Sequence, residues 1–122
     1  MREYKGDRTT GFESPARDYI EPVIDLAVAL DLRRPHTYPV RVTGQALRGR
    51  GIHDGDVLVV NAASEPVAGR VCVAIVDAEV LLATLHFKDA QWWLHHSELK
   101  SRLVEGDVEI WAIVEALVRF DV

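Results

Sequence analysis

The chain contains only one cysteine, Cys72, so a disulfide within the chain is excluded. Cys72 lies in the apolar run of residues 71–76, where a lone thiol is most often a small core residue of a protein kept in a reducing compartment. No apolar run approaches the roughly 18 residues that a membrane-spanning helix needs. The polar residues 1–10 contain no apolar signal core. We therefore expect a cytoplasmic protein that does not contact the membrane.

Positive charge is scarce as well. The 14 lysines and arginines are outnumbered by 19 aspartates and glutamates, which gives a net charge of −5. Proteins that hold DNA by themselves neutralise its phosphates with a basic surface. Arg33-Arg34 and the group Arg41, Arg48 and Arg50 are the basic clusters, and we expect them to be solvated surface. The charge balance therefore predicts no direct sequence-specific DNA binding, so that a partner protein would be needed for any action at DNA.

Apolar residues are plentiful enough for a core. With 122 residues, of which 48% are hydrophobic and 27% charged, the composition is ordinary for one globular domain. We assign residues 11–122 to a single domain and expect residues 1–10 to form a flexible arm. Pro22 is expected in the first turn of a short helix that ends before Pro35.

Beyond Pro35 the pattern becomes that of β structure. Short apolar or alternating stretches are separated by turn residues at intervals of about eight to twelve residues, which is typical of a sandwich or barrel. Strands are expected at residues 38–42, 57–60, 70–76, 79–85, 91–95 and 108–120, the last as one strand or two. Asp77-Ala78 is the expected hairpin turn between the third and fourth of these. The predicted fold is mainly β, a twisted sandwich or partly closed barrel with one short N-terminal helix.

The most informative motif is Gly44-Gln45-Ala46-Leu47, followed by Gly51-Ile52 and Asp54-Gly55-Asp56. In order and spacing these residues resemble the LexA/UmuD family of self-cleaving serine–lysine peptidases, whose loop reads Gly-Asp-Ser-Met before a Gly-Ile and an Asp-Gly-Asp turn. The resemblance to UmuD-like proteins covers residues 11–122 and implies the fold of the LexA/UmuD C-terminal domain. It places Ala46 at the nucleophilic serine and Ala83 at the general-base lysine.

Alanine at both positions removes the chemistry that the resemblance implies. A serine–lysine peptidase needs a hydroxyl beside a neutral lysine that accepts its proton, and an alanine methyl does neither. Gly44, Gln45 and Leu47 would retain the frame of the loop and of the oxyanion site. Thr84 is expected on the opposite strand face from Ala83, and Thr43 has no evident base, so neither replaces the missing pair.

The residues near the N-terminus resemble the cleavage site of UmuD-like proteins. That site precedes the glycine of Gly-Phe-x-Ser-Pro-Ala, and the equivalent bond here is Thr10-Gly11. Only ten mostly polar residues come before it, so the chain resembles the processed form of such a protein.

The resemblance implies a homodimeric accessory or regulatory subunit of a Y-family translesion DNA polymerase in the bacterial SOS response to DNA damage. It also implies contact with the recombinase filament that activates such proteins. Two alternatives stay open: engineered alanines that disarm a self-cleaving peptidase, and a decoy that dimerises with an active family member and inhibits it. Gln45, Leu47 and Thr84 also depart from the family's usual residues, which favours natural loss of the site.

Neither a cofactor nor a metal ion is expected. His95 and His96 are adjacent, and neighbouring residues of a strand point to opposite faces, so they are poor joint ligands. The chain contains no Cys/His spacing typical of a zinc site.

Overall fold

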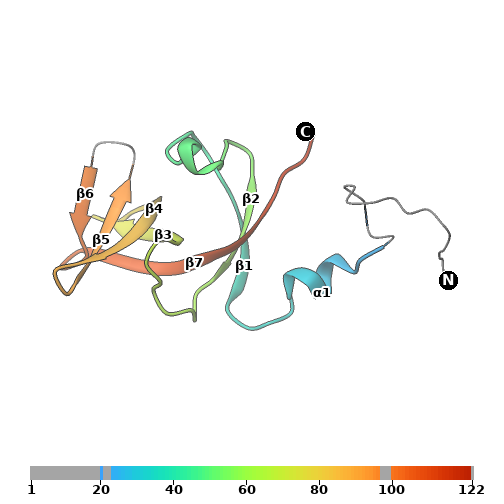
Figure 1. Ribbon diagram of the computed structural model, residues 1–122, viewed down its shortest axis with the longest axis horizontal. Helices are drawn as coiled ribbons and strands as arrows, with labels where there is room; N and C mark the ends of the chain where they lie inside the picture. The colour runs from blue at the N-terminus through green and yellow to red at the C-terminus, as the bar shows by residue number, and fades with distance from the viewer. Residues whose placement is uncertain (1–19, 21–22, 97–99, 122) are drawn as a thin grey trace, which may run out of the picture.

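In the computed structural model, which describes residue 20, residues 23–96 and residues 100–121, seven strands form one antiparallel sheet (Figure 1). In chain order the elements are α1 (Leu26–Leu30), β1 (Thr37–Arg41), the 3₁₀ helix η1 (Arg48–Arg50), β2 (Val57–Asn61), β3 (Val71–Val76), β4 (Glu79–Lys88), β5 (Gln91–His96), β6 (Lys100–Leu103) and β7 (Val108–Val118). The strands lie side by side in the order β1-β2-β7-β3-β4-β5-β6. The predicted mainly-β class is confirmed, with α1 as the short helix within the described residues, and the sheet is not closed.

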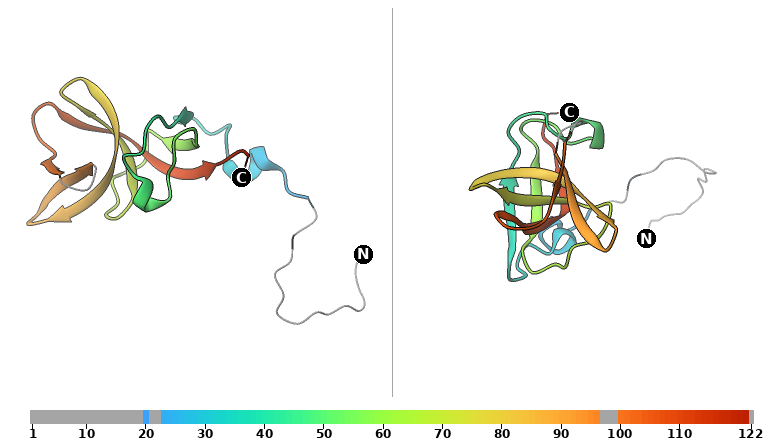
Figure 2. Two further views of the ribbon diagram at one scale, coloured as in Figure 1. Left: turned by 90° about the horizontal axis from the view of Figure 1, so that it is seen from above. Right: turned by 90° about the vertical axis from the view of Figure 1, so that its left-hand side faces the viewer.

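The long strand β7 joins the two halves of the sheet. Its first half pairs with β3 and its second half with β2, and it curves through the molecule in both Figure 1 and Figure 2. At two points β7 contains one residue more than the strand that it pairs with, and these extra residues are Trp111 and Glu115. The neighbours of Trp111 in β7 pair with two consecutive residues of β3, and the neighbours of Glu115 pair with two consecutive residues of β2. Such β-bulges bend a strand and redirect side chains. Within the predicted region 108–120, residues 108–118 form one bent strand.

Two tight hairpins follow from the turn residues. Val76 pairs with Glu79, so Asp77-Ala78 is a two-residue loop, as predicted. Asp89-Ala90 forms the equivalent loop between β4 and β5. All four loop residues have positive φ, between 51° and 70°, which is the backbone of a type I′ turn.

The core consists of two clusters, one on each face of β3. Val71 and Val73 belong to the first cluster, together with residues of the loop before β2, whereas Cys72 belongs to the second. Alternate residues of a strand point to opposite faces, so β3 is buried on both sides. The first cluster contains Val42, Leu47, Ile52, Leu58, Val60, Val71, Val73 and Ala112, and the second contains Cys72, Ala74, Val76, Ala83, Leu85, Leu94, Val108 and Ile113.

Helix α1 is shorter than predicted and buries none of its residues. The side chain of Asp25 accepts hydrogen bonds from the backbone N–H groups of Ala27 and Val28, so the helix begins after this cap. The predicted start at Pro22 lies outside the described residues. No helix in the described part of the chain has the length and apolar character needed to cross a membrane.

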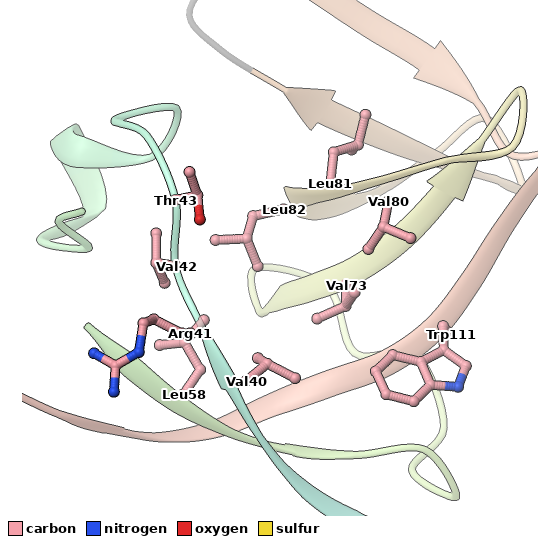
Figure 3. A pocket seen from close by; sticks show the side chains of 10 residues that line it. All are labelled: Val40, Arg41, Val42, Thr43, Leu58, Val73, Val80, Leu81, Leu82 and Trp111. Atoms are coloured by element: carbon pink, nitrogen blue, oxygen red, sulfur yellow. The ribbon is translucent and has the colours of Figure 1, made fainter. Parts of the chain in front are cut away.

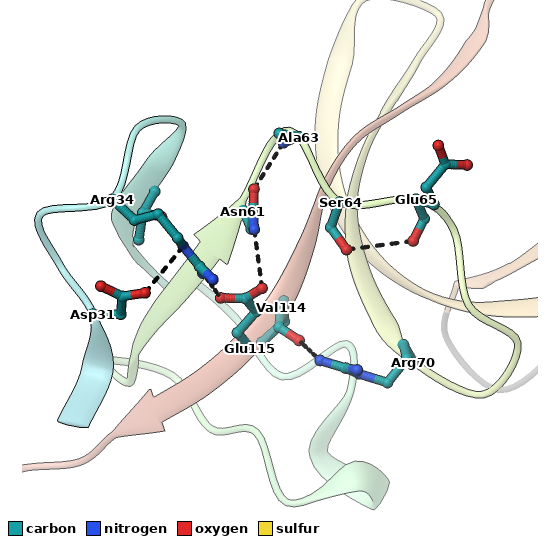
Figure 4. A network of polar contacts seen from close by, with 10 residues as sticks. Asp31, Arg34, Asn61, Ala63, Ser64, Glu65, Arg70, Val114 and Glu115 are labelled. Carbon is teal, nitrogen blue, oxygen red and sulfur yellow. Dashed lines mark hydrogen bonds and ion pairs between the residues drawn. The ribbon is translucent and has the colours of Figure 1, made fainter. Parts of the chain in front are cut away.

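The segment after α1 is tied to the sheet by a polar network. Arg34 forms an ion pair with Glu115, the bulged residue of β7, and also contacts Asp31 at 3.5 Å (Figure 4). Asn61 of β2 donates a hydrogen bond of 3.1 Å to the same Glu115 carboxylate. The bulge therefore presents an exposed carboxylate that joins β2, β7 and the segment leading into β1.

Candidate functional site

The candidate loop runs from the end of β1 to the start of β2, and backbone hydrogen bonds close its base. The Val42 N–H donates to the Asp56 carbonyl at 2.8 Å, and the Gly55 N–H donates to the Val42 carbonyl at 2.9 Å. Gly44 has a φ of 93°, a conformation that an L side chain rarely adopts. The Gly44 N–H donates to the Asp54 carboxylate at 2.7 Å, so the turn that precedes Ala46 is held in place.

The second aspartate of the Asp-Gly-Asp turn clamps the loop to the end of β7. Asp56 is only 2% exposed and accepts hydrogen bonds from Arg119 through both carboxylate oxygens, each at 2.7 Å. It also accepts from the His53 N–H at 2.8 Å, while Arg119 donates to the Gly51 carbonyl at 2.6 Å. The hydrogen bonds from Arg119 lower the pKa of Asp56 to about 2 and raise the pKa of Arg119. This contact between positions 63 residues apart was missed in the sequence, where no local pattern indicates Arg119.

Ala46 lies on the exposed side of this loop. The next residue, Leu47, is 8% exposed and packs with Val42 and Ile52 in the first core cluster. Gly44, Gln45 and Ala46 are exposed. Leu47 therefore anchors the loop in the core, while the position predicted for the nucleophile stands at the surface.

Ala83 occupies a different environment. It pairs with Cys72, is 0% exposed and belongs to the second core cluster with Leu85 and Leu94. Leu82, one residue earlier, packs against the first cluster. The structure thus brings β4 beside the loop through Leu82, whereas Ala46 and Ala83 lie in separate surroundings. Their assignment as the serine and lysine positions stays a prediction.

Between the loop and β4 lies an apolar cavity of about 250 Å³ (Figure 3). In Figure 3, Leu82 of β4 points toward Val42 and Thr43 across this cavity, and Trp111 lies at its other end. The full lining is Val40, Arg41, Val42, Thr43, Leu58, Val73, Val80, Leu81, Leu82 and Trp111. The hydroxyl among these residues is that of Thr43, and none of them is a carboxylate, histidine or lysine that would serve as its base. The cavity suits apolar side chains of a bound segment better than it suits acid–base chemistry.

The remaining candidate groups do not complete a catalytic set. Burial raises the pKa of the Cys72 thiol to about 12, so it is not a reactive thiolate. Thr84 is 9% exposed and pairs with Val71 and His95. Among the described residues, no cluster of three or more histidine, cysteine or acidic side chains is placed to hold a metal ion. The predicted cleavage-site residues Thr10 and Gly11 lie outside the described residues.

Comparison with known proteins places this geometry in a family. The profile of the Peptidase S24-like family matches residues 3–114. Protein SamA of Salmonella typhimurium is 34% identical over 109 residues, which cover 88% of this chain and 77% of SamA. Protein ImpA of Escherichia coli is 36% identical over 75 residues, 62% of this chain and 52% of ImpA, so the match spans about half of that protein. A LexA repressor, from Alcanivorax borkumensis, is 31% identical over 80 residues, 66% of this chain and 39% of the repressor.

The family profile extends over the loop, the lining of the cavity and β7 as far as Val114, whereas Arg119 of the clamp lies beyond it. This chain therefore belongs to the Peptidase S24-like family, as a UmuD-like member of the LexA/UmuD group.

Proposed function

We propose that this chain is a non-cleaving, UmuD-like subunit that forms a homodimer in the bacterial cytoplasm and binds a Y-family translesion DNA polymerase during the response to DNA damage. The observation that carries the proposal is an intact loop frame around a residue that cannot attack a carbonyl. Asp54, Asp56 and Arg119 hold the loop in place, and Ala46 stands at its exposed turn.

The surroundings of Ala83 support the same proposal. A serine–lysine pair needs the amine within hydrogen-bond reach of the hydroxyl. The β4 side chain that faces the loop belongs to Leu82, which is apolar, and Ala83 packs among Cys72, Leu85 and Leu94. A cavity without a base is suited to binding a segment of protein rather than cutting it.

A binding role also accounts for apolar side chains left on the surface. Val23, Val28 and Phe120 are 89%, 74% and 64% exposed, and α1 buries no residue. Contiguous exposed apolar patches often mark protein contacts, and Val23 and Val28 lie within one short stretch of chain. These residues are therefore candidates for the contact with a second copy or with the polymerase.

Size-exclusion chromatography with light scattering, on the chain alone and mixed with the host's Y-family polymerase subunit, tests the proposal. We expect a dimer that co-elutes with the polymerase, and we expect Val28→Glu to weaken one of these associations. Val67→Glu is the matched control, because Val67 is 45% exposed at a different site. A chain that neither dimerises nor binds the polymerase would contradict the proposal.

The intact loop frame also favours a second candidate, a self-cleaving peptidase disarmed at two positions. The double variant Ala46→Ser/Ala83→Lys would then cut near Thr10-Gly11, and neither single variant would do so. Mass spectrometry of the incubated protein detects this cleavage. If the double variant is folded by circular dichroism and still stays uncut, we reject this candidate. Mixing with an active homologue then tests the decoy, which would slow that homologue's self-cleavage.

A further inference from the structure

A second and larger pocket lies toward the opposite end of β4 from the cavity beside the loop. Its volume is about 690 Å³. It is lined by Ala68, His86, Phe87, Lys88, Asp89, Trp93, His95 and Ser101, which come from β4, the β4–β5 turn, β5, β6 and the segment before β3. The catalytic frame described above uses none of these residues.

Three aromatic rings of the pocket lie on one face of the sheet. His86 pairs with Trp93 and Thr84 pairs with His95, so the side chains of His86, Trp93 and His95 project to the same side. The two imidazoles are stacked, with centroids 3.8 Å apart and planes inclined by 27°. The Trp93 indole donates to the Lys88 carbonyl at 3.3 Å, which fixes the orientation of its ring. The pocket thus has an ordered aromatic wall.

A cationic side chain lines the pocket. Lys88 is exposed, and Asp89 beside it is the acidic residue of the lining. Burial, the neighbouring His95 and the positive charge of Arg50 lower the pKa of His86. The pocket therefore combines a lysine with an aromatic wall.

We propose that this pocket binds one nucleotide unit of single-stranded nucleic acid, with the base against Trp93 and His95 and the phosphate beside Lys88. Aromatic faces next to cations are the combination with which proteins hold single strands without reading their sequence. The net charge of −5 keeps the affinity low, on the order of 10⁻⁴ M, as for other non-specific contacts. The contact therefore becomes effective when a partner already holds the chain at the strand, and it involves no sequence-specific recognition.

Fluorescence anisotropy of a fluorescein-labelled oligothymidylate, titrated with the full chain, tests this site without any polymerase. One phosphate-facing cation predicts a slope of log K against log salt of about −0.7 on a single strand. Lys88→Ala should bring that slope close to zero. Loss of stacking in Trp93→Ala should weaken binding about 5-fold to 150-fold, with circular dichroism to verify its fold.

The stacked imidazole gives an independent readout. His95→Ala removes part of the surface against which the base lies, so it should weaken binding without changing the salt slope. Since His95 is exposed, this variant is expected to fold.

Arg33→Ala is the matched control, because it removes an exposed positive charge outside the pocket. The proposal is supported if Arg33→Ala binds like the unaltered chain while Lys88→Ala and His95→Ala bind less well. It is overturned if no binding occurs, if all three variants weaken it equally, or if polyglutamate of equal charge competes as well as the oligonucleotide. The last outcome would identify an acidic-peptide site. None of these results depends on whether the chain binds a polymerase.

Discussion

Replacing Ala83 by lysine introduces the residue that the family resemblance implies at this position. The substitution measures how completely the position excludes water. Ala83 is 0% exposed and packs with Cys72, Leu85 and Leu94, none of which can hydrogen-bond an ammonium well. Full burial lowers a lysine pKa by up to about 3–5 units from about 10.4. Each unit corresponds to about 1.36 kcal/mol, so the amine alone should cost about 4 kcal/mol of unfolding free energy at pH 7.

Steric crowding adds to that cost. Extra methylenes in a packed core typically cost about 1–3 kcal/mol, which brings the expected loss to about 5–7 kcal/mol. A domain of this kind has a total stability of about 5–15 kcal/mol, so the variant should be marginal or unfolded at pH 7. Ala83→Met provides the control for crowding, because it has similar length and no charge.

Urea unfolding followed by tryptophan fluorescence at several pH values separates the two contributions. Because burial lowers the pKa of the new lysine, its penalty is complete below the folded-state pKa and falls as the pH rises toward about 10.4. The difference between Ala83→Lys and Ala83→Met should therefore shrink between about pH 7 and pH 10. Val80→Lys, at a site 68% exposed on the same strand, should show little change. Equal stability of Ala83→Lys and Ala83→Met throughout this range would refute the reasoning.

Three further predictions concern the clamp, the turns and the thiol. Arg119 lowers the pKa of Asp56 from 3.8 to about 2, so the stability contributed by this ion pair is complete above pH 3.8 and is lost as the pH falls through about 2. In urea unfolding at several pH values, Asp56→Asn should lack this acid-dependent loss. A pH profile unchanged by the substitution would contradict the clamp. Ala78→Gly and Ala90→Gly should each raise the urea midpoint. Removing the strain of an alanine in the left-handed conformation stabilises the folded state by about 1–2 kcal/mol, whereas the greater backbone entropy of glycine in the unfolded state costs about 0.5–1 kcal/mol. A lower midpoint would argue against type I′ turns. Cys72 should react with a thiol reagent only after unfolding, whereas Ala46→Cys should react in the folded protein, and comparable protection of both thiols would show that Ala46 is not exposed.

Local sequence was sufficient for most of the strands and their turns. The apolar stretches on either side of Asp77-Ala78 predicted the β3–β4 hairpin, because such stretches and a short loop between them are both local properties. Strand β6 was not predicted, since Lys100–Leu103 has a single apolar residue and is defined by its pairing with β5. The helix was placed too early, because the cap at Asp25 outweighed the apolar residues before it.

The loop motif was also evident in the sequence, because glycine turns and residue identities are properties of a short stretch of chain; that Ala46 occupies a nucleophile position stays a prediction. Tertiary structure alone decided what surrounds them. Alternation along β4 predicts that Leu82 and Ala83 face opposite sides of the sheet. Only tertiary packing decides which side meets the loop: Leu82 packs against the cluster that contains Val42, and Ala83 belongs to the cluster of Cys72. The clamp between Asp56 and Arg119 likewise depends on how β7 bends, since the two residues meet only after the whole sheet has formed.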